Sequence, residues 1–258
     1  MPGKVVSIIQ ARTGSTRLPR KVLLDLEGKT VLEHVIGRAQ GSTLTDQLVV
    51  ATSINREDLA IVKISTDLGV SVYCGSEEDP LDRYYQAAQL FTAAHVVRLK
   101  ADCPLIDPEI VDDAIRLHLT SGADYTTNTL QRTYPAGQDV EILTKETLTR
   151  VWKHAKLLSE REHVTIYIPK HPDQFHIQHL EYKEDLSQNR WTLDYPEDHE
   201  LVHTIFKNLY PRNPIFGMND TLDFLSGNPE LEKINGHISV DAGVQRSLRQ
   251  DRIITFQD

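Results

Sequence analysis

The sequence predicts an α/β protein with a mainly parallel, Rossmann-like sheet flanked by helices, and with a smaller α+β lobe. Two observations support this prediction. In the first 120 residues or so, short apolar runs alternate with segments of helical periodicity, as in βαβ units. After about residue 123, the apolar runs give way to segments in which polar and apolar residues alternate, which indicates half-exposed strands.

The first half of the chain supplies the parallel part of the sheet. Apolar runs that stop at turn-forming residues predict buried strands at residues 5–9, 47–52, 70–74 and 95–99. Apolar side chains at helical spacing predict helices at residues 31–39, 56–68, 81–91 and 107–117. Gly69 marks a helix end, and Asp107 followed by Pro108 marks a helix start. In such sheets, ligands bind beyond the carboxyl ends of the strands.

The second half is predicted to be more mixed. Alternating segments predict half-exposed strands at residues 138–143 and 175–180, with helices at 145–157 and 160–168 between them. A short strand at 190–193 and a helix at 196–209 follow, and the last fifty residues are predicted to pack as helices. We therefore expect one integrated domain made of a core (1–125), a lobe (126–189) and a returning strand with C-terminal helices (190–258).

Composition excludes several classes of function. The chain has 258 residues, with 28 Lys+Arg against 37 Asp+Glu and a formal charge of −9, so it lacks the net basic character of general nucleic-acid-binding proteins. No apolar run approaches the roughly 18 residues that a membrane span requires. The two cysteines, Cys74 and Cys103, are typical of a reducing cytoplasm rather than of a disulfide framework.

Against this acidic background, the stretch IIQARTGSTRLPRKVL (residues 8–23) is locally basic, with four cationic residues and no acid from Arg12 to Lys21. It directly follows the first predicted strand. A Gly/Ser loop at that position can place backbone N–H groups around a phosphate, and Arg12, Arg17 and Lys21 add charge-assisted donors. Neither the Walker A pattern nor the Rossmann glycine fingerprint is present. The loop therefore predicts a local site for a small anion.

Two aspartates follow other strands and should face this loop. Asp102 comes after the strand at 95–99, and Asp194 comes after the short strand at 190–193. Either residue alone would be an ordinary turn or helix-start residue. Together beside a basic loop they suit Mg²⁺, which prefers one or two carboxylates completed by phosphates and water.

The stretch IIQARTGSTRLPRKVL resembles the nucleotide loop of the cytidylyltransferases that activate acidic sugars, and most closely that of the spore coat polysaccharide biosynthesis protein F family. Further motifs of the resemblance follow in order. They are GSEEDPLDRYYQAA (75–88), ADCPLIDPEIVD (101–112), RTYPAGQDVEI (132–142), REHVTIYI (161–168) and RWTLDYPEDHELV (190–202).

The resemblance implies a glycosyltransferase-A-type nucleotidyltransferase fold. It also implies transfer of CMP from CTP to an acidic sugar of 2-keto-3-deoxy type, with release of pyrophosphate, for surface or spore polysaccharide biosynthesis. Asp102 and Asp194 match the magnesium carboxylates of the 2-keto-3-deoxy-octulosonate branch, and Arg12, Lys21 and Asp102 are the expected catalytic residues. The expected nucleotide-binding residues are Arg12, Gly14, Ser15, Arg17, Lys21 and Lys100.

The expected acceptor site lies near the boundary of the lobe. Its expected residues are Tyr134, Gly137, Asp139 and Glu141, with Arg161 and His163 as additions to the same site. An ordinary exposed strand is the alternative interpretation of this segment. In relatives the lobe forms a dimer interface, so the resemblance also implies a homodimer.

The chain departs from the family pattern at two places. Arg20 stands where relatives usually have glycine, which costs about 1 kcal/mol if that position needs a positive φ. Lys100-Ala101 replaces the usual Thr-Gly or Gln-Gly before Asp102, close to where the base and ribose are expected. Both departures favour a non-catalytic nucleotide-binding relative as one alternative function.

Two enzymatic alternatives also remain open. A glycosyltransferase of the same fold usually carries D-x-D, whereas this chain has D-x-E at Asp25, Asp107 and Asp139. A zinc hydrolase would use histidine clusters, and the chain offers two pairs without the HExxH order. These pairs are His199 with His203 and His176 with His179.

Overall fold

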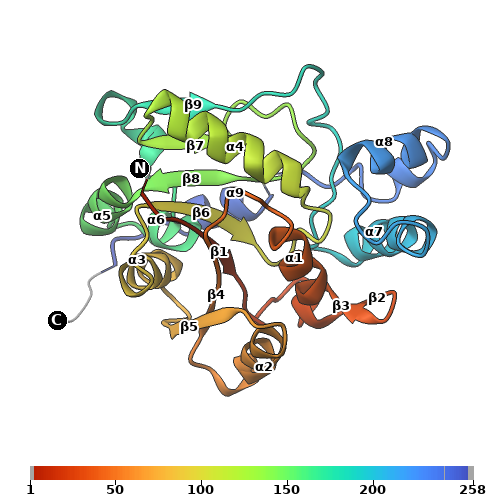
Figure 1. The fold of residues 1–258 in the computed structure, drawn as a ribbon, viewed down its shortest axis with the longest axis horizontal. Helices are drawn as coiled ribbons and strands as arrows, with labels where there is room; N and C mark the ends of the chain where they lie inside the picture. Colours follow the sequence, from red (N-terminus) through yellow and green to blue (C-terminus); the bar gives the residue numbers. More distant parts are fainter. Residues whose placement is uncertain (1–2, 241, 255–258) are drawn as a thin grey trace.

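The structure, a computed structural model, describes residues 3–240 and 242–254. Among these residues, a seven-stranded sheet has the order β5-β4-β1-β6-β8-β7-β9 (Figure 1). The parallel half consists of β5 (Ser71–Gly75), β4 (Gln47–Ser53), β1 (Val5–Gln10) and β6 (His95–Lys100). The mixed half consists of β8 (Glu141–Thr144), β7 (Tyr125–Thr127) and β9 (Ile177–His179). The predicted α/β class and the four parallel strands are confirmed.

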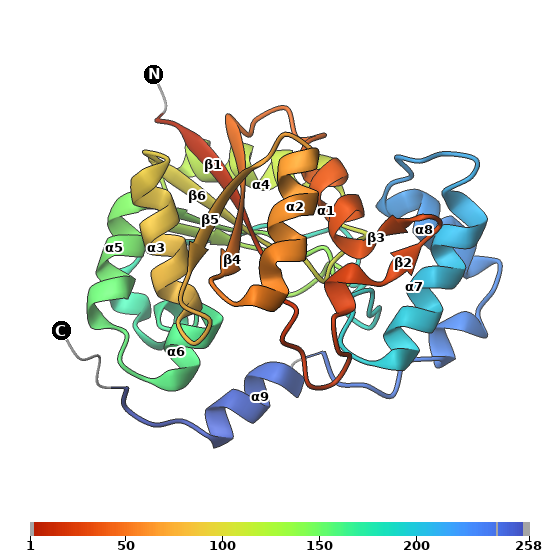
Figure 2. The same cartoon turned by 90° about the horizontal axis from the view of Figure 1, so that it is seen from below.

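Helices cover both faces of the sheet (Figures 1 and 2). The α-helices are α1 (Val31–Ala39), α2 (Leu59–Asp67), α3 (Pro80–Leu90), α4 (Pro108–Ser121), α5 (Lys145–His154), α6 (Leu158–His163), α7 (Pro196–Leu209), α8 (Met218–Ser226) and α9 (Ala242–Arg249). Short 3-10 helices cover Lys21–Leu23, Arg56–Asp58, Ile168–Lys170, Pro172–Gln174 and Leu231–Lys233. A two-stranded hairpin joins β2 (Asp25–Leu26) to β3 (Lys29–Thr30).

The sheet divides the buried side chains into two cores. In β1, Val5 and Ile9 belong to the core shared with α1, α4 and α7, while Val6 and Ile8 belong to the core shared with α3 and α5. Successive strand residues point to opposite faces, so a strand covered on both faces is apolar throughout. This explains why the parallel strands appear in the sequence as continuous apolar runs.

Local signals fix several helix ends, and the start of α4 at Asp107 and Pro108 is as predicted. Thr30 and Glu33 form a capping box at α1, in which the Glu33 N–H donates to Thr30 Oγ1 at 3.2 Å. Asp107 caps α4 by accepting from the Glu109 N–H at 2.9 Å, with Pro108 in the first turn. Gly122, with φ +63°, ends α4.

Three predictions for the second half are wrong. The strand predicted at 138–143 is shorter and buried, because β8 lies between β6 and β7 inside the sheet. Residues 190–193 form no strand: Arg190 makes one isolated bridge with Ala136. The helix predicted at 160–168 ends at His163, because Val164 adopts φ +66°. In addition, β7 and the β2–β3 hairpin were not predicted.

Three further features bear on the sequence predictions. Cys74 is exposed and Cys103 is buried, and both are free thiols. Across residues 3–240 and 242–254, no helix has the length and apolarity required to cross a bilayer. One of the two cores contains residues from both the 1–125 and the 190–258 segments, among them Ile9 and Phe206.

His118 is a buried titratable group on α4, far from the carboxyl ends of the parallel strands. Its Nδ1 lies 2.9 Å from Thr126 Oγ1, and its Nε2 lies 3.1 Å from His95 Nδ1. Burial, together with the neighbouring His95, lowers the pKa of His118 to about 4. The native state therefore holds this ring neutral at pH values where the unfolded chain protonates it.

We expect the protein to lose stability as the pH falls from about 6.5 to about 4, since the unfolded state binds the extra proton in this range. The lowered pKa of His118 corresponds to a loss of roughly 3 kcal/mol in the free energy of unfolding across this pH range. Urea unfolding across this range should show the slope, and His118→Gln should reduce it. The exposed His154→Gln variant serves as the matched control and should keep the slope. A slope unchanged in His118→Gln would contradict the assignment.

Candidate active site

A cavity of about 680 Å³ opens where β1 and β6 end. It is lined by the loop after β1, the ends of β6 and β8, and parts of α6 and α9. Although the chain carries a charge of −9, the described lining has more cationic than acidic side chains. The cations are Arg12, Arg17, Lys21, Arg98, Lys100, Arg132 and Arg246, and the acids are Asp102, Asp139, Glu141, Glu162 and Asp194. The cavity is thus suited to anionic ligands.

The basic loop after β1 is held in place by Asp58, which sequence reasoning missed. The backbone N–H and the hydroxyl of Thr13 donate to Asp58 Oδ1 at 2.8 and 2.6 Å, and Ser53 donates to its other oxygen at 2.5 Å. Although burial favours the protonated carboxyl, these hydrogen bonds outweigh it and lower the pKa of Asp58. The ionised Asp58 thereby fixes the loop against the end of β4.

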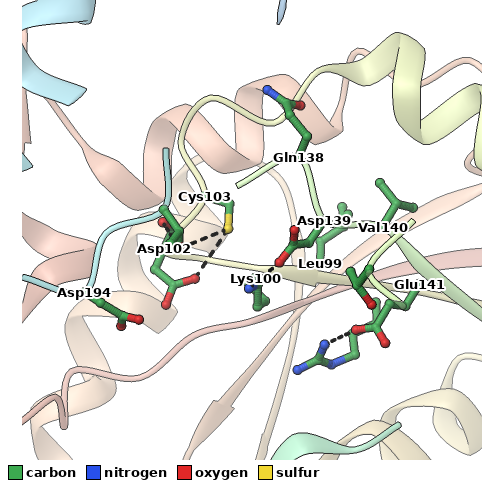
Figure 3. A network of polar contacts seen from close by, with 12 residues as sticks. Leu99, Lys100, Asp102, Cys103, Gln138, Asp139, Val140, Glu141 and Asp194 are labelled. Atoms are coloured by element: carbon green, nitrogen blue, oxygen red, sulfur yellow. Dashed lines mark hydrogen bonds and ion pairs between the residues drawn. The ribbon is translucent and has the colours of Figure 1, made fainter. Parts of the chain in front are cut away.

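Lys21 joins the two predicted metal carboxylates. Its Nζ donates to Asp194 Oδ1 at 2.6 Å and also to Asp102 Oδ2, and Arg17 contacts the same Asp194 oxygen at 2.9 Å. Burial opposes the charge on Lys21, but the two carboxylates outweigh it and raise its pKa. In the same way, Lys21 and Arg17 outweigh burial and hold the pKa of Asp194 well below its usual range. Figure 3 shows the two carboxylates near one another.

Asp194 is positioned by the start of α7. The backbone N–H groups of Asp194 and Tyr195 both donate to Asp198 Oδ2 at 2.9 Å. Asp198 is fully buried and is paired with Arg190, with Nε–Oδ1 at 2.8 Å and a second bond at 2.9 Å. The Leu193 N–H donates to the Asp102 carbonyl at 2.8 Å, which ties the two acidic segments together.

A second set of charge pairs forms the floor of the cavity (Figure 3). Arg98 and Glu141 are register partners on β6 and β8, and their side chains form an ion pair. Two residues further along the same strand, Lys100 pairs with Asp139 at 2.7 Å. Side chains two residues apart share a face, so the adjacent strands place both pairs side by side.

These floor carboxylates are ionised and fully engaged. Asp139 also accepts from Arg132 at 2.6 Å, and the two cations outweigh burial and hold its pKa well below its usual range. Glu141 also accepts from Thr165 at 2.6 Å and from the Tyr125 hydroxyl. Arg98 and these hydroxyls outweigh burial and lower the pKa of Glu141. The floor is therefore rigid and salt-bridged.

Most predicted site residues line this one cavity. They are Arg12, Gly14, Ser15, Arg17, Lys21, Lys100, Asp102, Asp139, Glu141, His163 and Asp194. Tyr134 and Gly137 lie outside its lining: Tyr134 packs against Tyr182 with ring centroids 5.4 Å apart, and Gly137 packs against the Trp191 backbone. Arg161 also lies outside and pairs with Asp79 on the approach to α3.

Sequence reasoning missed several cavity residues. Arg98 and Arg132 were not singled out, although charged residues at alternate positions of an apolar strand are a usable signal, as in Arg98-Leu99-Lys100. The contribution of α9 was also missed, because nothing in its sequence indicates which part of the fold it contacts.

The cytidylyltransferase family model matches residues 6–213. This chain belongs to that family. It is 37% identical to an uncharacterized protein of Methanocaldococcus jannaschii, over 96% of this chain and 98% of that one. It is 33% identical to the spore coat polysaccharide biosynthesis protein SpsF of Bacillus subtilis, over 88% and 95% of the two chains. A solved cytidylyltransferase from Leptospira borgpetersenii superposes with a TM-score of 0.85 at 34% identity, covering 88% of this chain and 96% of that one.

Membership in this family agrees with the nucleotidyltransferase fold of the mainly parallel sheet. The described residues contain no group of three or more His, Cys, Asp or Glu side chains that could hold a metal ion. The rings of His199 and His203 are tilted by 32° with their centroids 5.8 Å apart, and His203 Nε2 lies 4.0 Å from Glu27 Oε1. Asp102 and Asp194, in contrast, converge on a single cationic atom.

The shared contact of Asp102 and Asp194 with Lys21 shows whether these two carboxylates could also bind one divalent cation. The oxygens of Asp102 and Asp194 both lie within bonding distance of the Lys21 ammonium, so they can share one cation between them. Two carboxylates leave the remaining coordination positions for phosphates and water, which is the arrangement that Mg²⁺ prefers. The residues present therefore fit a nucleotide-bound Mg²⁺.

Arg20, the departure from the family glycine, adopts φ +55° and ψ +28°. It is exposed, and its N–H donates to the Thr13 carbonyl at 3.2 Å within the loop. For a residue with a Cβ atom this left-handed conformation is strained by about 1 kcal/mol. The backbone here keeps a conformation suited to glycine although the chain has arginine.

We expect Arg20→Gly to raise the free energy of unfolding by about 0.5–1 kcal/mol, because glycine removes the Cβ strain. The matched control is Arg20→Ala, which removes the charged side chain but keeps Cβ and should show no such gain. Urea midpoints at constant slope measure both. An equal gain in both variants would assign the effect to charge instead of backbone strain.

Proposed function

We propose that this protein transfers CMP from CTP to an acidic sugar of 2-keto-3-deoxy type, with release of pyrophosphate and with Mg²⁺ as cofactor. The single observation that carries the proposal is the meeting of the basic loop with Asp102 and Asp194 at one end of the cavity, around Lys21. The cytidylyltransferase family of the chain supports the choice of nucleotide.

The triphosphate would lie along the loop after β1. Gly14 and Ser15 line the cavity there, and the Ser15 N–H donates to the Thr13 carbonyl at 2.8 Å within the loop. Arg12 also lines the cavity and has no ion pair or hydrogen bond to any residue in the described ranges. Asp102 and Asp194 would hold Mg²⁺, which supplies positive charge to the phosphates and lowers the pKa of a nucleophilic hydroxyl. Lys21, which bonds both carboxylates in this structure, would turn to a phosphate when Mg²⁺ takes its place between them.

The reaction is an in-line displacement at the α-phosphorus. The anomeric hydroxyl of the sugar forms the new P–O bond and gives up its proton to water in the open cavity. The bond between the α-phosphorus and the bridging oxygen breaks, and pyrophosphate leaves with its electrons. The protein contributes mainly positioning and charge neutralisation. Arg12 and Lys21 stabilise the negative charge that develops on the departing pyrophosphate.

The acceptor would occupy the other half of the cavity, above the charge pairs of Asp139 and Glu141. Gly137 has a shaping role, since a Cβ there would lie 2.8 Å from the Trp191 carbonyl carbon and oxygen. Tyr134 is a buried core residue and anchors the chain segment that contains Gly137. The relative named for spore coat polysaccharide biosynthesis supports a role in surface polysaccharides. A homodimer through residues 126–189 belongs to the same proposal.

A glycosyltransferase of this fold is less well supported. Of the D-x-E aspartates, Asp107 caps α4 and Asp139 is held by two cations, while Asp25 lies in the β2–β3 hairpin. The non-catalytic alternative rested on Arg20 and Lys100. Lys100 lines the cavity, but its ion pair is with Asp139 on the floor. Asp102 is paired with Lys21 instead, so Lys100 does not block it.

The proposal is tested by thermal-shift titration with CTP, UTP, GTP, ATP and dTTP, each with and without Mg²⁺. CTP with Mg²⁺ should give the largest shift, because a ligand that binds only the native state at about 100 times its Kd adds about 2.7 kcal/mol. Asp102→Asn and Asp194→Asn should lose the Mg²⁺-dependent part. The matched control Asp113→Asn, at an exposed acid paired with Arg116, should keep it.

Pyrophosphate release with CTP and 3-deoxy-manno-octulosonate then tests the reaction. We expect release that requires both substrates and Mg²⁺. A Mg²⁺-dependent shift with a different nucleotide would retain the reaction type and replace CTP. Nucleotide binding without pyrophosphate release from any acidic sugar would favour the non-catalytic alternative.

A further inference from the structure

The C-terminal helix α9 forms one wall of the cavity. Val240, Gly243, Val244, Arg246, Ser247 and Gln250 are among its lining residues. Figure 2 shows α9 lying across the molecule between the α6 side and the loop after β1. A Cβ on Gly243 would lie 3.7 Å from the Arg17 guanidinium, so the helix begins beside the nucleotide loop.

The other end of α9 is bonded to the acceptor half. Ser247 Oγ donates to Glu162 at 2.8 Å and lies 2.9 Å from His163 Nε2. After the helix, Asp251 accepts from the backbone N–H and the hydroxyl of Ser159 at 2.9 and 2.8 Å. Ile253 then forms an antiparallel bridge with Leu157. These bonds fix α9 over the cavity without using Arg246.

The cations that line the cavity differ in what they bond. Arg17 and Lys21 are paired with Asp194, and on the floor Arg98, Lys100 and Arg132 are paired with Glu141 and Asp139. Among the described lining residues, Arg12 and Arg246 are the two cations without an ion pair or hydrogen bond. Arg12 belongs to the nucleotide loop. Arg246 is exposed and lines the cavity, and it directly precedes Ser247, whose Oγ lies 2.9 Å from His163 Nε2.

We propose that Arg246 of α9 is a specificity-determining residue that binds the carboxylate of the acidic sugar. The inference rests on the proposed function and assigns a role to the C-terminal helix. An acidic acceptor brings one further negative charge into the cavity, and the floor cations are already neutralised by their own acids. A guanidinium is suited to a carboxylate because it can donate two parallel hydrogen bonds.

A matched pair of variants separates this role from a general effect of charge. Arg246 lines the cavity, whereas Arg249, one turn further along α9, borders only a smaller hollow of about 410 Å³ that Arg246 also borders. With CTP and 3-deoxy-manno-octulosonate, Arg246→Gln should raise the KM for the sugar about 10- to 100-fold, as expected for one charged hydrogen-bonded contact. Arg249→Gln should change it less than about twofold.

The kinetic parameter that changes shows whether Arg246 binds the sugar or only maintains the structure of α9. At saturating sugar, the kcat of Arg246→Gln should fall less than about threefold, and its thermal shift with CTP and Mg²⁺ should equal that of the wild type. Arg246→Lys should recover part of the affinity, since it keeps the charge and loses the bidentate geometry. A general distortion of α9 would instead change nucleotide binding and kcat together, and that result would overturn the proposal.

A second experiment compares the acidic sugar with a neutral acceptor. The primary amide of the same sugar lacks the negative charge, so the wild type should prefer the acid and Arg246→Gln should lose most of that preference. An unchanged preference in the variant overturns the role of Arg246 while leaving the proposed function intact. If the wild type releases no pyrophosphate with any acidic sugar although it binds CTP, the proposed function fails, and the role of Arg246 fails with it.

Discussion

The ion pairs around Lys21 hold together parts of the chain that are far apart in sequence. One ammonium group contacts Asp102 after β6 and Asp194 before α7, and Arg17 reinforces the second contact. The three segments meet only because β1 and β6 are adjacent parallel strands, while the Leu193–Asp102 backbone bond brings in the third. This junction places the basic loop and the two acids at one end of the cavity.

Burying so many charges costs free energy unless each is paired. A buried ion with its partner removed is strongly destabilising, typically by 3–5 kcal/mol. The floor of the cavity satisfies this condition through in-register pairs across β6 and β8, and Asp198 satisfies it through Arg190 and two backbone donors. Among the described lining residues, Arg12 and Arg246 remain without an ion pair, so they can bind an anionic ligand.

The sequence and the structure agree best where local pattern decides the outcome. The parallel strands are apolar on both faces, so their burial is visible as continuous runs, and the caps of α1 and α4 are visible as Thr30 with Glu33 and as Asp107 with Pro108. Agreement is weaker for β8. The alternation over residues 138–143 predicted a half-exposed strand, but Glu141 is buried, and its charge is neutralised by Arg98 on β6.

The sequence by itself determined the fold class, the basic loop after β1 and the acids that face it, because these depend on local periodicity and on residue types next to strand ends. The tertiary structure alone decided which charges are paired and which are free. Arg98, Lys100 and Arg132 are engaged while Arg246 is not, and that difference depends on strand register and on where α9 packs. Contacts between residues far apart in the chain are set by packing, and no local sequence pattern records them.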